Sequence, residues 1–525
     1  MSISLPRLAI PLSGMALLAA LAGCSVGPDF RPPDAPAATT YLVDPQKPDL
    51  MAAGIPGGEA QKIVESLDIP GQWWGVFRSP QLNSLIESAL VANPDIKATA
   101  ASLKIAQLNA RAQRSTLFPT IGLALGASQN QVAPILQSPL TNQNSIFGLF
   151  TAGLTLTYAL DIWGGNRRQI ESLEALAEQQ CFQLEGAYLS LASNVVAAAI
   201  LEASLRAQVE ATRRIIAAQR ETLGILQRVS GLGAIPGADV ATQEAALAQA
   251  ETTLPPLEKA LAQQRNLLAN LTGRATSDPV AERFTLSDLK LPADLPLSLP
   301  SRLVEQRPDV RAAEANLHSA GALVGVAISN QLPQITLSVG LGTTGVGTDA
   351  LFGPSQTSTN VGGSLLQTII DGGALATRKQ AALAGLEQAE AQYRSSVLNA
   401  FRNVADTLNA LEYDAITLKA AVEAERAASS SLAIARRRLE LGDTTYVFVL
   451  IAELTYQQTQ ITRIQAQAAR LTNTAALFQA LGGGWWNRDS AEATAGQRSR
   501  CHAPVPTPAP GYISSKTTPP LISAR

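Results

Sequence analysis

The chain of 525 residues carries 40 Lys and Arg against 42 Asp and Glu, which gives a formal net charge of −2. This balance argues against a basic surface for nucleic acid, so no nucleic-acid partner is expected. Aromatic residues make up 5% of the chain, which suits long alanine-rich helices better than one thick globular core.

Residues 1–23 are predicted to be a targeting signal. Arg7 supplies a basic start, an apolar stretch follows at 8–20, and small residues precede Cys24. This pattern resembles the bacterial lipobox, which implies a diacylglycerol and an N-acyl lipid on Cys24 and, because Ser25 follows, transport to the outer membrane. Two acyl chains would make a stable membrane anchor. The alternative is an ordinary secretory signal with an incidental cysteine.

Beyond Cys24 no run of 18 or more purely apolar residues occurs, so no transmembrane helix is expected. The remaining cysteines, Cys181 and Cys501, suggest neither a disulfide framework nor a metal site. His318 falls on a predicted helix without a metal ligand at suitable spacing. Acidic residues are scattered along helices rather than converging in pairs, so the sequence predicts no catalytic site, no metal and no enzyme activity.

Residues 24–72 are rich in Pro, Ala, Gly and Asp and are predicted to be an extended mature N-terminus. Trp73-Trp74 mark the start of packed structure. Residues 80–91 then predict a short amphipathic helix whose apolar face is formed by Leu82, Leu85, Ile86 and Leu90.

The next helix start occurs twice in the chain. One helix is predicted to open at Asn93-Pro94-Asp95, with Asn93 as its N-cap, and to end near residue 117. A similar motif, Arg307-Pro308-Asp309, is predicted to begin a second helix, which ends near residue 331. When the chain is aligned with itself so that Pro94 meets Pro308, several residues of the first half coincide with identical residues of the second half. These residues are Pro94, Asp95, Ala98, Ala101, Leu103, Ala106, Pro119, Ile121, Leu123 and Gly126. The chain is therefore interpreted as a duplication.

The duplication sets the domain boundaries. Residues 73–273 form the first repeat and 301–486 the second, each with a helix, two strands, a long helix, a tip and a return helix. Residues 274–300 form an equatorial linker, and residues 487–525 form a tail that is predicted to be disordered.

Four segments alternate apolar side chains with small or polar ones, at 118–128, 149–161, 334–341 and, less clearly, 361–371. This period of two is typical of transmembrane β-barrel strands, although a soluble sandwich would show it as well. Because four strands cannot close a barrel around water and an open sheet edge is not tolerated in lipid, several chains must share one barrel. Three copies give twelve strands, so a trimer is predicted. Segments 129–146 and 343–358 are expected to be outer loops.

Two very long helices are predicted at 166–229 and 374–440, with lengths of about 95 and 100 Å. Each ends in a Leu-Gly turn, and return helices are predicted at 239–272 and 446–480. Pro255-Pro256 is expected to kink or break the first of these. A return helix of about 50 Å and an ascending helix of about 36 Å together match one long helix, so each repeat can form two parallel rods.

These elements predict a mixed α+β membrane protein. Four β-strands per chain contribute to a trimeric twelve-stranded β-barrel, which continues as a long α-helical barrel of coiled-coil-like helices. The internal two-fold sequence repeat places a pair of strands and a long helix in each half.

The motifs that characterise the chain are the lipobox, Trp73-Trp74, the two Pro-Asp helix starts, Asp371-Gly372-Gly373 and the Ala-Leu-Gly-Gly-Gly-Trp segment at 480–485. In this order they resemble the bacterial outer-membrane efflux protein family, the TolC-like channel-tunnels, and most closely its lipoprotein branch of the OprM or NodT type. The resemblance covers residues 24–486.

The resemblance implies a homotrimer in the outer membrane of a Gram-negative bacterium, anchored to the lipid bilayer and extending into the periplasm. It would be the passive exit duct of a tripartite efflux system for small molecules. Its partners would be a periplasmic adaptor (membrane fusion) protein and, through it, an inner-membrane transporter of the RND type. Because a duct need not recognise its cargo, the sequence does not encode the substrate.

Both tip turns match the family motif that meets the adaptor's helical hairpins. The adaptor-docking residues implied by the resemblance are Leu232, Gly233, Ile235, Leu441, Gly442 and Thr444. A glycine turn allows close backbone approach and the adjacent leucine offers an apolar contact. The alternative is that the two glycines only end helices.

A pore constriction is implied just beyond the tips, where relatives often place acidic residues. Asp239 matches such a position, but the second repeat has apolar residues instead, and the positions of a polar latch are Leu439 and Thr444. We therefore hypothesise that Val447, Phe448 and Ile451 form an apolar constriction that resists ions by dewetting. The alternative is that these side chains only pack between helices.

Two other functions remain open from the sequence. A type I protein secretion duct would share the same geometry. A non-conducting, lipid-anchored trimeric stalk or adhesin would explain the lipid and the long helices, but not strands with one small, polar face.

Overall fold

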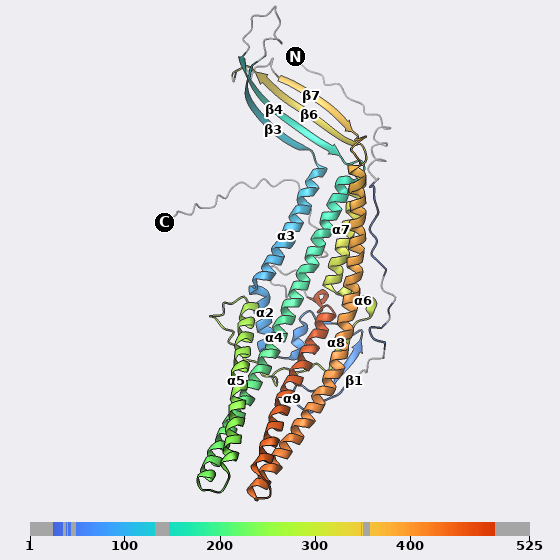
Figure 1. Cartoon of the computed structure of the whole chain (residues 1–525). Helices are drawn as coiled ribbons and strands as arrows, with labels where there is room; N and C mark the ends of the chain where they lie inside the picture. Colours follow the sequence, from blue (N-terminus) through green and yellow to red (C-terminus); the bar gives the residue numbers. More distant parts are fainter. Residues whose placement is uncertain are drawn as a thin grey trace, which may run out of the picture.

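A computed structural model of the chain describes residues 25–34, 38, 40–43, 49–131, 146–347, 349 and 357–488. The predicted lipid site at Cys24 and most of the two predicted outer loops lie outside these residues. The described part is an elongated stack of helices with a curved sheet at one end and two helical hairpin tips at the other (Figure 1).

Eight α-helices build the described rod: α2 (Pro80–Ala92), α3 (Pro94–Arg114), α4 (Gly165–Gly231), α5 (Gly237–Leu271), α6 (Pro300–Gln306), α7 (Pro308–Ser329), α8 (Ala374–Glu440) and α9 (Tyr446–Ala480). The long helices α4 and α8 each have 67 residues, and the return helices α5 and α9 each have 35. All predicted helices are present, with ends that shift by at most a few residues.

Side chains cap the backbone N–H groups at the starts of α3 and α8, and Asn93 is the N-cap predicted from the sequence. The Asn93 side chain accepts hydrogen bonds from the backbone N–H groups of Asp95 and Ile96 at the start of α3, as an N-cap should. At α8 the Asp371 carboxylate accepts from the N–H groups of Gly373 and Leu375. These bonds hold the pKa of Asp371 below its usual value, because they stabilise the ionised form.

Of the predicted kink or break at Pro255-Pro256, the break is wrong, because α5 runs through both prolines. Each proline removes one intrahelical N–H donor. The carbonyl groups left without a donor belong to Glu251 and Thr252, which are half-buried and exposed, and both prolines are exposed, so this side of the helix lies at the surface.

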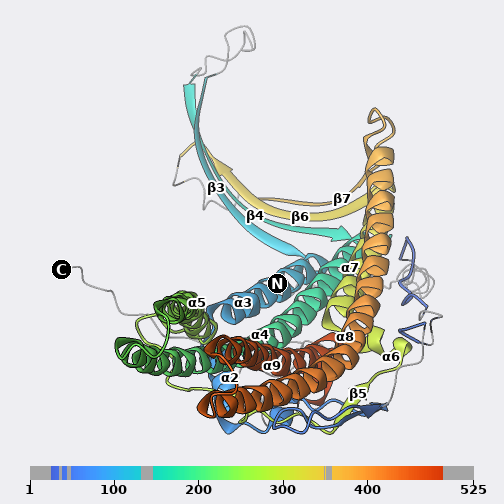
Figure 2. The ribbon, with the colours of Figure 1, turned by 60° about the horizontal axis from the view of Figure 1, so that its bottom comes forward.

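The larger sheet has four antiparallel strands in the order β3-β4-β6-β7. The strands are β3 (Thr120–Gln131), β4 (Ile146–Leu160), β6 (Gln334–Gly345) and β7 (Thr357–Leu366). The fourth strand was predicted at 361–371 and lies earlier, because residues 367–373 form the connection that Asp371 caps. Within the described chain β3 and β7 each have one neighbour only, and the sheet curves strongly between them (Figure 2).

A small second sheet near mid-height was not predicted. It joins β1 (Asp49–Leu50), β2 (Gln61–Glu65) and β5 (Asp294–Leu297), with β2 and β5 parallel. The segment before Trp73 is thus partly folded, and so is the linker at 274–300. Arg470 of α9 is fully buried and fastens this region, because its guanidinium donates to the backbone oxygens of Met51 at 3.0 Å and Glu59 at 2.7 Å.

The main hydrophobic core lies around this small sheet. Its largest fully buried side chains include Trp73, Phe77, Phe284 and Phe478. Helix α4 packs against α3, α5, α7 and α9, and α8 packs against α7 and α9. The ascending helices α3 and α7 and the return helices α5 and α9 therefore cover successive parts of the long helices.

Among the described residues one helix, α4, is long and apolar enough over one 18-residue stretch to cross a membrane, but 61% of that stretch is buried inside the protein, as in a core helix. Cys181 of α4 is buried and disulfide-bonded, although a disulfide was not predicted from the sequence. The fold also continues to Arg488, two residues into the predicted tail.

Candidate functional site

The large sheet sorts its side chains onto two chemically different faces. Its register aligns Ile121, Leu156, Val339 and Val361 in one row across all four strands. A second row places Leu123, Leu154 and Leu341 beside one another on the same face, and Leu123 is 71% exposed. This face is an apolar surface that the described part of the chain leaves uncovered.

The opposite face of the sheet is small and polar. The row between the two apolar rows contains Gly122, Thr155, Gly340 and Asn360. Side chains alternate between the faces of a strand, so the period of two in the sequence is expressed here as an apolar face and a polar face. In this respect the sheet matches the strand prediction.

At the far end of the rod, two glycine turns close the helical hairpins. Gly233 between α4 and α5 has φ +76°, and Gly442 between α8 and α9 has φ +73°. Both positions are open, since a Cβ atom would meet nothing within 4 Å, so the backbone conformation rather than space requires glycine. The following N–H groups bond back to the last helical turns, at Val229 and Arg438.

The predicted docking residues divide into two groups. Leu232 is 85% exposed and Leu441 is 67% exposed, so both leucines project from the tips beside their glycines. Ile235 instead packs on the apolar cluster that joins the hairpins, and Thr444 is half-buried. Four of the six residues, including both glycines, are therefore presented to solvent.

The predicted constriction residues lie on one exposed face of α9. Val447, Phe448 and Ile451 follow the spacing that places side chains together on a helix, and Phe448 is 63% exposed. Phe448 and Ile451 line an open groove of about 570 Å³ with Arg438 and Asp443. Val447 is 45% exposed and Ile451 is 55% exposed, so within the described residues neither side chain is enclosed between helices.

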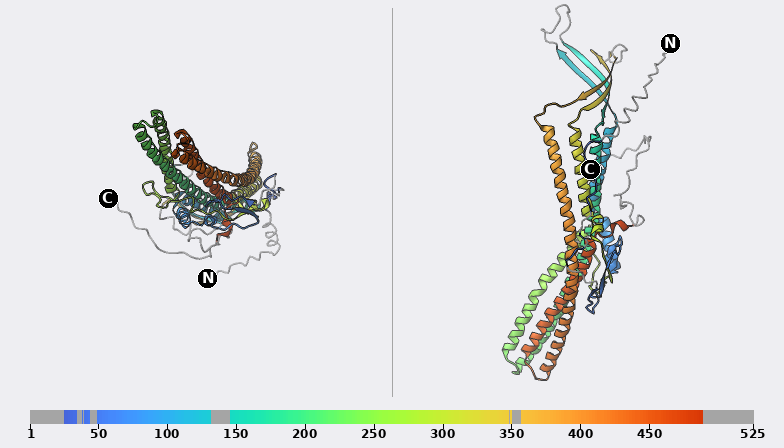
Figure 3. Two further views of the ribbon diagram at one scale, coloured as in Figure 1. Left: turned by 90° about the horizontal axis from the view of Figure 1, so that it is seen from below. Right: turned by 90° about the vertical axis from the view of Figure 1, so that its right-hand side faces the viewer.

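Asp239 belongs to the other hairpin. It lies in the first turn of α5 and is half-buried. The two hairpins lie side by side at the tip (Figure 3), so both repeats contribute to one end of the molecule.

A buried polar bridge between the hairpins was missed from the sequence. The Tyr446 hydroxyl at the start of α9 donates to Oε1 of Gln243 in α5 at 2.5 Å, and Nε2 of Gln243 donates to the backbone oxygen of Gln219 at 2.9 Å. Burial raises the pKa of Tyr446, so the hydroxyl stays protonated and remains a donor. The sequence does contain one indication of this bridge, because the helical period places the polar residue Gln243 on the inner face of α5.

The bridge is surrounded by an apolar cluster that draws on three helices. Leu226 of α4, Leu432 of α8 and Val449 and Leu450 of α9 are buried there. Nearby, Glu453 is buried 3.5 Å from Arg436. Burial raises the pKa of Glu453 and the Arg436 guanidinium lowers it, with burial the larger effect.

The described residues contain no group of three His, Cys, Asp or Glu side chains placed to hold a metal ion. His318, the one described histidine, stacks on Phe30 and lies 2.9 Å from Glu171, where it helps to hold the N-terminal segment against the rod.

An open sheet with one apolar face, set on very long helical hairpins with apolar tips, defines the class of channel-tunnel proteins of the outer membrane. The sequence profile of the family described as "Outer membrane efflux protein" matches residues 85–274 and 299–483. The chain belongs to this family.

Individual relatives agree with this assignment. The chain is 30% identical over 423 residues to the pyoverdine export outer membrane protein OpmQ of Pseudomonas aeruginosa, covering 79% of this chain and 87% of the relative. It is 27% identical to the toluene efflux pump outer membrane protein TtgC of Pseudomonas putida, covering 89% and 94%. Its fold is similar to the crystal structure of the outer membrane protein VceC of Vibrio cholerae, with a TM-score of 0.71, 26% identity and coverage of 79% and 100%.

The chain is thus the outer-membrane channel-tunnel of a tripartite efflux system in a Gram-negative bacterium, and as a family member it assembles with partner components of such systems.

Proposed function

We propose that three copies of the chain share one twelve-stranded β-barrel, which continues as a helical tunnel and serves as a passive exit duct for small molecules. The observation that carries the proposal is a pair of apolar rows, one across all four strands and one across β3, β4 and β6, next to two strand edges that have no partner among the described residues. Lipid accepts the apolar face, and closure around three chains removes the edges that lipid does not tolerate.

The joint between subunits would pair β3 of one copy with β7 of the next. To test it, single cysteines are placed in β3 at Leu123 and in β7 at neighbouring positions around Val361, in a background where Cys181 and Cys501 are serine. We expect at least one pair to cross-link the protein into trimers under oxidation. Pairs within β4 and β6 serve as controls that cross-link only within one chain. Absence of any intermolecular product along the whole length of β7 would contradict the shared barrel.

The proposal includes the two repeats as functional units. The first repeat (73–273) and the second (301–486) would alternate around the trimer, so six hairpins would ring the tunnel's end. An adaptor protein would then dock on Leu232 and Leu441, which project from the tips. Apolar side chains beside exposed glycine turns suit the tips of a partner's helical hairpins.

Small molecules are the proposed cargo because the names of similar proteins refer to pyoverdine and toluene. An RND-type transporter in the inner membrane would supply them through the adaptor. As a duct the chain would need no catalytic group, and we propose that it has no enzymatic role. A strain that lacks the gene should become sensitive to solvents or dyes, and the plasmid-borne gene should restore resistance; unchanged sensitivity to every efflux substrate would contradict this cargo class.

A lipid on Cys24 completes the proposal. The acyl chains would insert in the inner leaflet beside the barrel and add a second anchor to the membrane. Mass spectrometry of the mature protein should show a diacylglycerol and an N-acyl group on its first residue. The variant Cys24→Ser should lose that mass, and an unmodified Cys24 in the native protein would refute the lipid anchor.

A further inference from the structure

The two repeats of the chain meet along one interface, which is called the internal interface below. It joins β4 and α4 of the first repeat to β6 and α7 of the second, because β4 pairs with β6 and α4 packs against α7. The corresponding elements at the outer sides of the chain are β7 and α8 in the second repeat and β3 and α3 in the first. β3 and β7 form opposite edges of the sheet, and α3 and α8 lie on opposite sides of the upper rod (Figure 1).

The repeats correspond residue by residue along these helices. α3 begins at Pro94 and α7 at Pro308, while α4 begins at Gly165 and α8 at Ala374. Both long helices have 67 residues, so counterparts can be counted along their whole length. Each residue that lines the internal interface therefore has a counterpart on one of the two outer sides of the chain.

Side chains that are buried at the internal interface have exposed counterparts. Ser172 of α4 and Ser319 of α7 are buried, and their hydroxyl oxygens lie 2.8 Å apart. Counted from the helix starts, Ala381 of α8 corresponds to Ser172, and Ile105 of α3 corresponds to Ser319. Ala381 is exposed and Ile105 is 59% exposed. A second copy that covers α3 as α4 covers α7 would bury the large side chain of Ile105 against the small one of Ala381.

A pair of opposite charges is repeated in the same way. The Arg311 guanidinium of α7 lies 3.9 Å from the Glu178 carboxylate of α4 across the internal interface. The counterpart of Arg311 is Lys97 of α3, and the counterpart of Glu178 is Glu387 of α8. Both counterparts retain the sign of the charge, and both are exposed. The two outer sides of the chain are therefore complementary in charge at this level of the rod.

The strands follow the same correspondence. Ile121 pairs with Leu156 in the first repeat, and Ile335 pairs with Leu365 in the second. Because Ile335 is the counterpart of Ile121, Leu365 is the counterpart of Leu156. The hydrogen-bonded sheet and the helices thus give one common alignment of the repeats.

This alignment gives a register for the joint between two copies. Leu156 pairs with Val339 at the internal interface, and the counterpart of Val339 in β3 is Leu125. Leu365 of one copy is therefore expected opposite Leu125 of the next. Leu365 is 65% exposed and Leu125 is 75% exposed, and both belong to the apolar face of the sheet. A register that was wrong by one residue would have placed them on opposite faces.

The same register reaches beyond the end of β7. Leu160 pairs with Ile335 at the internal interface, so the counterpart pair is Ile369 of one copy with Ile121 of the next. Ile369 follows the last residue of β7, Leu366, and is 82% exposed. In the assembly β7 should lengthen to Ile369, because the neighbouring strand supplies the missing hydrogen-bond partners.

We propose that the interface between copies repeats the internal interface, with β7 and α8 of one copy against β3 and α3 of a second copy of this chain. This inference rests on the shared barrel proposed above, and adds the strand register and the helix contacts. The contact is head-to-tail, so it uses two different surfaces of each chain and closes when the copies form a ring.

Paired cysteines test the register, in the background where Cys181 and Cys501 are serine. Leu365→Cys and Leu125→Cys, combined in one chain, should link copies into trimers under oxidation. Directly opposed residues of antiparallel strands have Cα atoms about 4.5–5.5 Å apart, which a disulfide spans. The control combines Leu125→Cys with Val361→Cys, about 13 Å farther along the strand, and should give at least tenfold less product.

The outcomes separate this inference from the shared barrel. If the control pair cross-linked as efficiently as the pair in register, or if another position of β7 were the efficient partner of Leu125, the register would be overturned and the shared barrel would stand. If no position along β7 gave an intermolecular product, the shared barrel would be refuted, and this inference with it.

A carbodiimide, which joins an amine to a carboxylate in contact with it, tests the helix alignment. Treatment of the native assembly should link Lys97 of one copy to Glu387 of the next, in a product with the mass of two chains whose cross-link is located by mass spectrometry. Glu387→Gln should abolish this product. Glu423→Gln is the matched control on α8, because its counterpart Arg214 is exposed on α4, and it should leave the product unchanged. A cross-link from Lys97 to another carboxylate, or none, would contradict the alignment.

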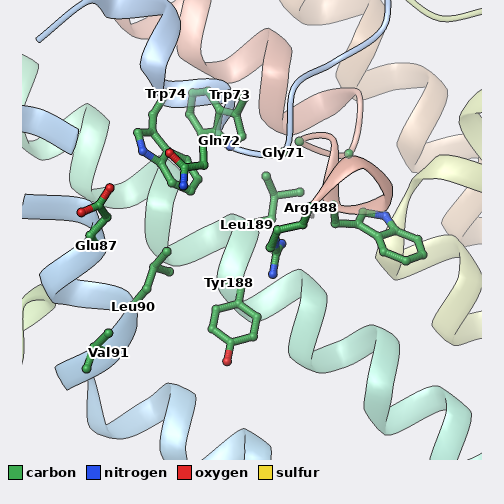
Figure 4. A pocket seen from close by; sticks show the side chains of 13 residues that line it. Gly71, Gln72, Trp73, Trp74, Glu87, Leu90, Val91, Tyr188, Leu189 and Arg488 are labelled. Atoms are coloured by element: carbon green, nitrogen blue, oxygen red, sulfur yellow. The ribbon is translucent and has the colours of Figure 1, made fainter. Parts of the chain in front are cut away.

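A pair of aspartate variants tests burial of α3 in the assembly. Ile105→Asp would place a charge in the joint and should lower the fraction of trimer in detergent at least tenfold. Val91→Asp is the matched control. Val91 is 60% exposed beside a pocket of about 400 Å³ that α2 and α4 help to line (Figure 4), and its counterpart Glu305 in α6 is exposed. This control should remain trimeric. An unchanged trimer fraction in Ile105→Asp, or an equal loss in both variants, would argue against the helix contacts.

Discussion

The buried bridge between Tyr446 and Gln243 should control how readily the helical tip opens. The bridge links α9 to α5, so it can form only while the two hairpins of a chain lie together. The substitution Tyr446→Phe removes the donating hydroxyl and retains the ring that packs in the apolar cluster. It leaves Oε1 of Gln243, a fully buried side chain, without its donor.

The expected magnitude follows from that lost partner. A buried acceptor without a donor costs about 1–3 kcal/mol. The cost applies to the conformation in which the hairpins touch, and disappears when they separate and water reaches Gln243. The equilibrium should therefore shift toward separated hairpins by a factor of about 5–150.

The assay is single-channel recording of the purified protein in planar bilayers. We expect Tyr446→Phe to raise the probability of the conducting state by a factor in that range. Tyr456→Phe is the matched control, since the Tyr456 hydroxyl contacts only Gln460 of its own helix at 3.5 Å, and it should leave the recordings unchanged. If Tyr446→Phe and the control gave the same open probability as the native channel, the bridge would not hold the tip together.

Three further predictions concern the same end of the molecule. Replacing Phe448 by alanine should increase the conductance of the isolated channel, because it removes the largest exposed apolar side chain of the proposed constriction; an unchanged conductance would reject that constriction. The double substitution of Leu232 and Leu441 by aspartate should abolish adaptor binding in a pull-down while leaving the melting temperature unchanged, and retained binding would place the adaptor elsewhere. Burial raises the pKa of Glu453 in the folded state above its ordinary value of 4.5. The protonated carboxyl group therefore stabilises the fold at pH values below 4.5, and this stabilisation is lost as the pH rises through the raised pKa. Glu453→Gln should therefore raise the melting temperature at pH 7 but not at pH 4, and a loss of stability at pH 7 would reverse the assigned balance between burial and Arg436.

The long elements could be predicted because their ends carry strong local signals. Helix α8 was predicted at 374–440 and has those bounds, since a glycine pair precedes it and a Leu-Gly turn follows. The strands of the large sheet were found from their alternation alone, and their register supports the proposed lipid-facing surface. These features depend on residues that are neighbours in sequence.

What the sequence did not reveal depends on distant partners. Strands β2 and β5 are short, one contains Pro296, and they pair across more than two hundred residues. The Tyr446–Gln243 bridge spans 203 positions. Even the two prolines in α5 were misjudged, because their effect depends on which face of the helix meets water. The exposed leucines at the tips were identified through the family resemblance rather than by periodicity.

The most direct test of the duct is single-channel conductance of the purified protein in planar bilayers, combined with its oligomeric mass in detergent. The shared barrel predicts a trimer whose conductance is small or rarely seen, and which conducts steadily once the helical tips are truncated. A monomer, or a trimer that never conducts even without its tips, would contradict the channel and favour a non-conducting stalk.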